Sequence, residues 1–392
     1  MPPVLAVFID ALSPEDIKYM RFLNSFENSV RVKTELPSYS NTCHASIYTG
    51  VFPEKHQYIF AWRYSPENSS FRLLKRLKVI NILTNHNHVL KALAYLSICK
   101  LYYEQFHLPY FYFLSRYPAD YWSYFDLKMV RHWNDPDPFI GKYPTIFEIL
   151  KRNGIEYQTV WVPKGPLRRI EQIQDTNKPF TYIFIGHTDG LFHHYLQNSE
   201  KTKKVLKEID KALERIYFRF TNKNEDLIFL VFSDHGHISI KERISLDCLF
   251  KSNGKNLKDY IHFVDACQAR FWFRNEKEET EVKAVLNGIN DRGYTLNDKI
   301  LKDFHARVDR NLYGHLIFQL KPSYVFAEAV PPNTVSVHGY PPDDPRIDAV
   351  LISNKEIPTT RNYIRLEDIA PTILHVLGLE VPSYMDGEPI WT

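Results

Sequence analysis

Three apolar runs without polar alternation stand out along the chain, and each of them ends in an aspartate. The runs "VLAVFID", "YIFIGHTD" and "LIFLVFSD" end in Asp10, Asp189 and Asp234. Short runs of β-branched and aromatic residues are typical of strands that are buried on both faces, as they are in parallel sheets. We therefore predict three strands of one parallel sheet.

Helical patterns lie between these runs. The segment 144–155, "PTIFEILKRNGI", has proline at its start and glycine near its end, and a second helical pattern covers 199–220. This alternation predicts an α/β fold with a doubly wound, mostly parallel sheet that is flanked by helices. Ligands bind beyond the carboxyl ends of the strands in such sheets. The three aspartates are therefore expected at one edge, although each one alone could simply cap a helix.

Two segments interrupt the alternation of strands and helices. Residues 61–140 are rich in aromatic side chains and prolines, and residues 243–335 contain a charged, helix-like stretch. We predict that both are cap-like insertions that lie over the functional site. The predicted catalytic core then consists of residues 1–60, 141–242 and 336–392.

The first insertion contains an unusual aromatic segment. Half of the 24 residues in 102–125 are Phe, Tyr or Trp. The pattern favours a satellite hydrophobic core. A cap whose rings stack on a base, a sugar or an apolar leaving group is a second interpretation. Peripheral contact with a membrane, helped by nearby lysines, is a third.

Composition narrows the classes of function. The 392 residues are 44% apolar and carry a net charge of +3, which argues against disorder and against a dedicated nucleic-acid binder. The four cysteines are widely spaced and form no CxxC pair, which argues against a disulfide framework or a thiolate zinc site. The chain shows neither a signal peptide nor a transmembrane segment, so we expect a cytoplasmic protein.

Carboxylates and histidines recur at spacings that suit metal binding. "TDGLFHH" places Asp189 and His193 four residues apart, "SDHGH" joins Asp234 to His235, and "SVHGYPPDDP" places His338 ahead of a strand at 348–353. Together with Asp10 these make six ligands without a thiolate, a set that suits Zn²⁺ or, in its place, Mn²⁺. Six ligands exceed the needs of one open catalytic ion, so we expect two divalent ions. The nearby histidines at 44, 56, 187, 194 and 237 are not expected to be metal ligands.

These motifs together resemble those of a known group of enzymes. The blocks are "VLAVFIDAL", "LPSYSNTCHASIYTGVFPEKHQ", "PTIFEILKRNGI", "TDGLFHH", "VFSDHGH", "VHGYPPDDPRIDAVLIS" and "LEDIAPTILHVLGLEVPSYMDGEPI". In this order they resemble the alkaline phosphatase superfamily, and most closely its type I phosphodiesterase/nucleotide pyrophosphatase family. The resemblance implies that one metal ion binds Asp189, His193 and His338. It implies that the other binds Asp10, Asp234, His235 and the oxygen of the nucleophile.

The resemblance also identifies the nucleophile. The family frame of Pro37, Thr49-Gly50 and the block 53–56 puts Ser40 at the nucleophile position. Asn41 follows it and is expected to bind a phosphoryl oxygen. Cys43 stands where nucleotide-cleaving relatives usually have Asn, and "CHASI" lacks the Cys-x-Pro-x-Arg pattern of a sulfatase.

The implied function is a two-metal phosphoric ester hydrolase of the phosphodiesterase/nucleotide pyrophosphatase type, with a phosphoseryl-type intermediate on Ser40. Its substrate would be a small-molecule phosphoester, a nucleotide or another diester. The alternatives are a phosphomonoesterase or phosphonate hydrolase, a phosphoglycerate mutase-like isomerase and a non-catalytic binding protein. His338 lies 103 residues after His235, which argues against the isomerase, where the two are close.

Overall fold

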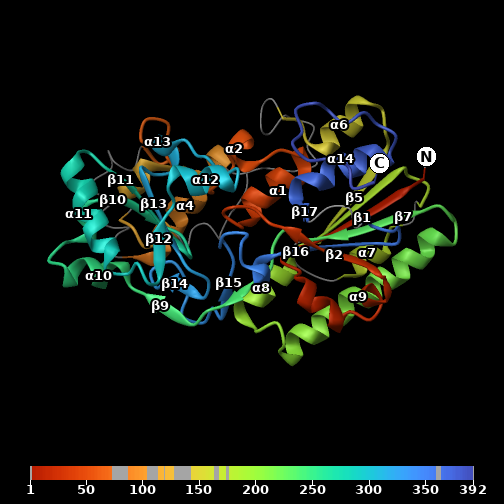
Figure 1. The fold of residues 1–392 in the computed structure, drawn as a ribbon, viewed down its shortest axis with the longest axis horizontal. Helices are drawn as coiled ribbons and strands as arrows, with labels where there is room; N and C mark the ends of the chain where they lie inside the picture. Colours follow the sequence, from red (N-terminus) through yellow and green to blue (C-terminus); the bar gives the residue numbers. More distant parts are fainter. Residues whose placement is uncertain are drawn as a thin grey trace.

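A seven-stranded sheet forms the centre of the computed structural model, which describes residues 2–72, 87–103, 114–118, 120–127, 143–162, 167–173, 176–358 and 363–391 (Figure 1). Along the sheet the strands are β17 (Ile364–Arg365), β2 (Asn28–Lys33), β16 (Ala349–Ser353), β7 (Ile228–Phe232), β1 (Val4–Ile9), β6 (Phe180–Ile185) and β5 (Tyr157–Val162). β1 pairs in parallel with both β6 and β7, whereas β16 is antiparallel to its two neighbours. The predicted mostly parallel sheet is therefore confirmed.

The sheet carries helices on both faces, because alternate residues of β1 point to opposite sides. Val4, Ala6 and Phe8 pack in the cluster that contains α1 (Ser40–Thr49), α6 (Ile146–Arg152) and α14 (Ile369–Val376). Leu5, Val7 and Ile9 pack in the cluster that contains α7 (Arg168–Glu171) and α9 (Glu200–Thr221). Figure 1 shows these two groups of helices on opposite sides of the sheet. Burial on both faces explains why the strands lack polar alternation.

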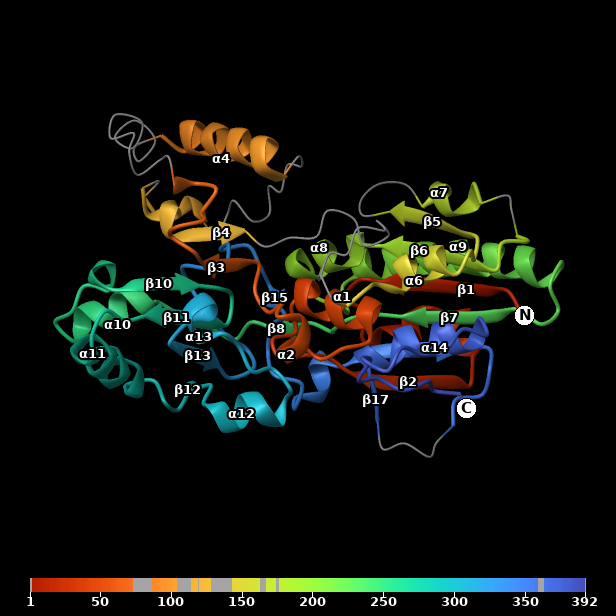
Figure 2. The ribbon, with the colours of Figure 1, turned by 90° about the horizontal axis from the view of Figure 1, so that it is seen from above.

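The second insertion forms a sheet of its own. Its antiparallel strands follow the order β10 (Ile261–Val264), β11 (Gln268–Trp272), β13 (Leu316–Leu320) and β12 (Gly293–Thr295). The helices α10 (Leu246–Ser252) and α11 (Glu276–Asn287) cover it, and Figure 2 shows this lobe beside the central sheet. The domain boundaries that the sequence suggests stay a prediction.

Further helices and short strands lie outside the two larger sheets. They are α2 (Pro53–His56), β3 (Trp62–Tyr64), α4 (His88–Tyr103), β4 (Phe125–Leu127), α8 (His187–His194), β8 (Ile238–Ser239), β9 (Glu242–Ile244), α12 (Asp298–Asp303), α13 (Arg310–Tyr313), β14 (Tyr324–Phe326) and β15 (Ser336–Val337). Within the described ranges, no helix is both long enough and apolar enough to cross a membrane.

Part of the aromatic segment 102–125 lies outside the described residues. In the described part, Leu114, Tyr117 and Trp122 are buried in one cluster with Phe263 and Trp272 of the second sheet. These three residues belong to a hydrophobic core, in line with the first interpretation of the segment.

A buried pair of carboxyl groups packs against α1, the helix that begins at Ser40. Glu35 and Glu367 are 5% and 2% exposed, and the Oε1 atom of each is buried without a hydrogen-bond partner. The Oγ atom of Ser46 lies 3.1 Å from the Nε2 atom of His56. Burial raises the pKa of Glu35 to about 7, and burial together with the charge of Glu35 raises the pKa of Glu367 well above its ordinary value. The native protein therefore holds protons that the unfolded chain releases.

This pair predicts a pH-dependent stability. Both pKa values are raised in the folded state, so the stabilisation is complete below about pH 4.5, and the part that comes from Glu35 is lost as the pH rises through about 7. Glu35→Gln mimics the protonated carboxyl. We expect the variant to be more stable than the wild type at pH 8, by on the order of 1–3 kcal/mol, with no gain at pH 4.5.

Denaturant unfolding of metal-free protein at both pH values measures the difference. The control is Glu225→Gln, which changes an exposed glutamate and should alter neither value. Parallel pH profiles for the wild type and Glu35→Gln would contradict a raised pKa of Glu35 in the folded protein.

Candidate active site

The carboxyl ends of three adjacent strands bring the predicted ligands together. Asp10 follows β1, Asp234 lies two residues beyond β7, and Asp189 belongs to α8, which begins just after β6. The structure places the six predicted ligands in two groups, and the ligand atoms within each group lie within 4.8 Å of one another. The convergence that the sequence predicted is present.

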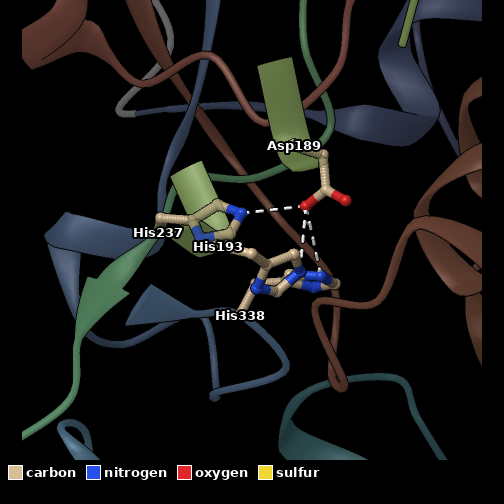
Figure 3. Close-up of side chains that lie close together, drawn as sticks. All are labelled: Asp189, His193, His237 and His338. Atoms are coloured by element: carbon tan, nitrogen blue, oxygen red, sulfur yellow. Dashed lines mark hydrogen bonds and ion pairs between the residues drawn. The ribbon is translucent and has the colours of Figure 1, made fainter. Parts of the chain in front are cut away.

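The first group contains one carboxylate and three imidazoles (Figure 3). The Nε2 atoms of His237, His193 and His338 lie 2.9, 3.4 and 3.5 Å from the same oxygen of Asp189, Oδ1. His193 stands four residues after Asp189 on α8, so both point to one side of the helix. His237 was not expected among the ligands, although it stands only two residues after His235 in the "SDHGH" motif.

The hydrogen bonds on the far side of each ring define its tautomer. The Nδ1 atom of His193 donates to the carbonyl of Ser336 at 2.9 Å, and that of His338 donates to the carbonyl of Ser38 at 2.8 Å. His237 donates from Nδ1 to the hydroxyl of Ser336, whose own hydrogen goes to a carbonyl. A neutral ring that is held in this way presents the lone pair of its Nε2 atom.

These lone pairs face a carboxylate oxygen, which has no hydrogen to donate. Burial lowers the pKa of His237 and of His338 to about 3, so both rings are neutral at physiological pH. Lone pairs of three imidazoles and one carboxylate that meet at a point repel one another unless a cation lies between them. The donor set fits a metal ion with nitrogen and oxygen ligands.

The second group consists of Asp10, Asp234 and His235, all of them buried. The Oδ1 atom of Asp10 is buried without a hydrogen-bond partner, and the Nε2 atom of His235 lies 3.3 Å from Asp234. Burial raises the pKa of Asp10 well above its ordinary value, and the charges of Asp234 and Asp189 raise it further. A buried carboxylate in this position needs a compensating positive charge. This group therefore also fits a divalent cation.

Ser40 lies beside the second group, at the first residue of α1. Its Oγ atom is 3.1 Å from the Nε2 atom of His235. The amide nitrogen of Asn41 is buried and has no hydrogen-bond partner, and both residues line a cavity of about 220 Å³. Cys43 is a buried thiol beside Thr34, and burial raises its pKa well above the ordinary value. A protonated thiol is a poor nucleophile, which argues against Cys43 in that role.

The remaining histidines near the motifs take other positions. His44 lies 3.5 Å from the second carboxylate oxygen of Asp234, His56 bonds to Ser46, and His194 is exposed. Ala11 adopts a left-handed conformation with φ of 59° and donates its N–H to Asp234. This backbone conformation favours glycine.

Comparisons with known proteins agree with this geometry. The family model described as type I phosphodiesterase/nucleotide pyrophosphatase matches residues 4–341. Human ectonucleotide pyrophosphatase/phosphodiesterase 5 has a similar structure, with a TM-score of 0.67, 13% identity, and coverage of 99% of this chain and 97% of that chain.

The murine form of the same protein, an inactive variant in complex with AMP, gives a TM-score of 0.67 at 11% identity, over 97% of this chain and 96% of that chain. At these identities the likeness supports the fold alone. No curated protein sequence matches the chain.

The geometry predicts that His237 contributes to metal affinity. His237→Ala removes one of the four ligand atoms of the first group, and we expect the affinity for Zn²⁺ to fall by about 10-fold or more. Competition with a chromophoric chelator measures the dissociation constants of the folded variants. His194→Ala removes a neighbouring exposed histidine and should bind like the wild type. Equal affinities in all three proteins would exclude His237 from the site.

Proposed function

Because this chain belongs to the type I phosphodiesterase/nucleotide pyrophosphatase family and is a phosphoester hydrolase, we propose that it is a two-metal phosphodiesterase or nucleotide pyrophosphatase with Ser40 as its nucleophile. The observation that supports this best is the orientation of the imidazoles. The rings of His193, His237 and His338 all present Nε2 lone pairs to Asp189. A second buried ligand group lies next to Ser40.

The family implies divalent metal ions, and the two groups are the residues that would hold them. Nitrogen and oxygen donors without thiolates favour Zn²⁺, with Mn²⁺ as a replacement. Bound there, the ions would screen the charge of the phosphoryl oxygens and lower the pKa of the serine hydroxyl.

Individual residues of the chain have separate roles in the proposed reaction. Ser40 Oγ forms a bond to phosphorus in line with the departing oxygen, which leaves as an alcohol or a phosphate. The amide of Asn41 donates its unused hydrogen bond to a phosphoryl oxygen, because its nitrogen lacks another partner and the residue lines the same cavity as Ser40. Water next cleaves the phosphoseryl bond and restores the serine. Two in-line displacements retain the configuration at phosphorus.

The substrate class follows from the family and from the cavity beside Ser40. The inactive murine relative was obtained in complex with AMP, which is consistent with a nucleotide or another small phosphodiester as the substrate here. Apolar groups of Phe60, Ala61 and Val337 line the cavity. A second ester substituent can cover these groups, whereas a phosphomonoester would leave them exposed to water.

Two expectations from the sequence complete the proposal. We place the protein in the cytoplasm. Peripheral contact with a membrane would involve the aromatic segment 102–125, of which residues 104–113 and 119 lie outside the described ranges.

Replacement of the nucleophile gives the most direct test. We expect Ser40→Ala to lower the turnover of a phosphodiester by about 10³-fold or more while its metal content stays near that of the wild type. Steady-state rates together with metal analysis by mass spectrometry measure both quantities. Cys43→Ala removes the neighbouring thiol and should keep most of the activity. Wild-type turnover by Ser40→Ala would show that Ser40 is not the nucleophile.

The cavity predicts a preference for diesters. We expect a higher kcat/KM for bis-p-nitrophenyl phosphate than for p-nitrophenyl phosphate, because only the diester has a second substituent for the cavity. Parallel assays with Zn²⁺-loaded and Mn²⁺-loaded enzyme provide the comparison. A higher value for the monoester would favour a phosphomonoesterase, and the absence of hydrolysis with either metal would favour a binding protein.

A further inference from the structure

The cavity beside Ser40 has a second wall, which comes from the lobe of residues 243–335. The turn between β10 and β11 contributes Asp265 and Ala266 to the lining. Ser40, Asp189 and His338 line the same cavity. A substituent on a phosphorus atom held at Ser40 can therefore reach the turn.

Asp265 is a rigid carboxylate in this wall. The residue is 9% exposed, and both Nε and Nη2 of Arg270 lie 3.0 Å from its Oδ2 atom. Arg270 is fully buried, and it donates from Nη1 to the carbonyl of Trp62 at 2.8 Å. Its guanidinium lies 4.1 Å from the centre of the Phe60 ring. Arg270 takes one oxygen of the carboxylate, and Oδ1 is left for another donor.

An ionised carboxylate accepts hydrogen bonds and donates none. Oδ1 of Asp265 therefore favours a ligand that carries an O–H or N–H group, and it disfavours a further phosphate or carboxylate. A full positive charge has little advantage here, because Arg270 offsets the charge of Asp265 and Arg116 donates to the carbonyl of the preceding residue, Val264. The best donor is thus a neutral hydroxyl.

The surroundings of Asp265 agree with a small hydroxylated group. Phe60, Ala61, Ala266 and Val337 supply apolar contacts, and the alanines leave space because their side chains are short. Such a surface packs against the C–H groups of a polyol, while one carboxylate oxygen accepts from a hydroxyl.

We propose that this cavity binds a phosphoester substituent of the polyol class, such as a glycerol or a sugar, and that Asp265 selects it by accepting a hydrogen bond from a hydroxyl. The inference rests on the proposed function, because it takes the phosphoryl group to lie at Ser40. It specifies a substrate class that the metal ligands and the nucleophile leave open.

Binding to an enzyme that cannot turn over tests this selection. The Zn²⁺-loaded Ser40→Ala variant is titrated with glycerol 3-phosphate and with propyl phosphate, which differ only in two hydroxyls. A hydrogen bond to a charged acceptor predicts that glycerol 3-phosphate binds at least about 10-fold more tightly by calorimetry. Equal dissociation constants would overturn the proposal. Tighter binding of phosphocholine than of glycerol 3-phosphate would also overturn it, in favour of a cation site.

Asp265→Asn in the same background assigns the selection to its carboxylate. The ratio of the two dissociation constants should fall to near one. Asp259→Asn changes an exposed aspartate of the same lobe and should keep the ratio. A ratio that survives in Asp265→Asn would exclude this residue as the selecting group.

A second variant keeps the test valid if Asp265→Asn does not fold. Ala61→Leu fills part of the cavity and leaves Asp265 and Arg270 themselves unchanged. It should weaken the binding of glycerol 3-phosphate and of propyl phosphate by about 10-fold or more but leave the binding of inorganic phosphate unchanged. Unchanged binding of glycerol 3-phosphate to this variant would contradict the location of the polyol.

A separate assay distinguishes failure of the proposed function from failure of the polyol inference. Hydrolysis of bis-p-nitrophenyl phosphate by the wild type tests the chemistry and does not depend on Asp265 selecting a polyol. Hydrolysis without selective binding refutes the polyol inference alone. Selective binding without hydrolysis refutes the proposed reaction and leaves a polyol phosphate-binding site.

Discussion

The burial of three carboxylates at one edge of the central sheet is the constraint on which the site depends. Asp10 and Asp234 follow adjacent parallel strands, and Asp189 follows the third, so the topology of the sheet brings their charges together. Burial and mutual repulsion raise the pKa of Asp10 well above its ordinary value. Such an arrangement is unfavourable for an empty protein core and favourable around cations. The fold thus keeps a local instability that a ligand can remove.

The backbone directs the histidines toward this charge. Carbonyl groups of Ser336 and Ser38 hold the Nδ1 hydrogens of His193 and His338, so these rings cannot turn their lone pairs away. The hydroxyl of Ser38 accepts the N–H of Gly339, which has a φ of 103°. A side chain at Gly339 would collide with the ring of Tyr39, the residue that precedes Ser40. The nucleophile loop and the loop of His338 are therefore positioned by each other.

The sequence predicted the parts of the molecule that follow from local patterns. Apolar runs that end in aspartate identified β1, β6 and β7, and the spacing of Asp189 and His193 identified one side of α8. His237 was missed because the six expected ligands already satisfied two ions, and only the fold brings its Nε2 atom to 2.9 Å from Asp189. The wall of the cavity that contains Asp265 could not be predicted from the sequence either. The contact of Asp265 with Arg270 is local, but its place in the cavity of Ser40 depends on how a lobe of about 90 residues packs against the core.

This distribution of residues separates the chemistry from the choice of substrate. The strands of the central sheet position the carboxylates, which can shift little without disturbing a core that is buried on both faces. The turn that carries Asp265 belongs to a different sheet, and Arg270 links it to the carbonyl of Trp62 in the first insertion. Residues of both segments, 61–140 and 243–335, therefore line the same cavity, and one buried guanidinium connects them. Changes in these segments can alter the group that the cavity accepts while the ligands and the serine stay in place, because no strand of the central sheet contributes to that wall.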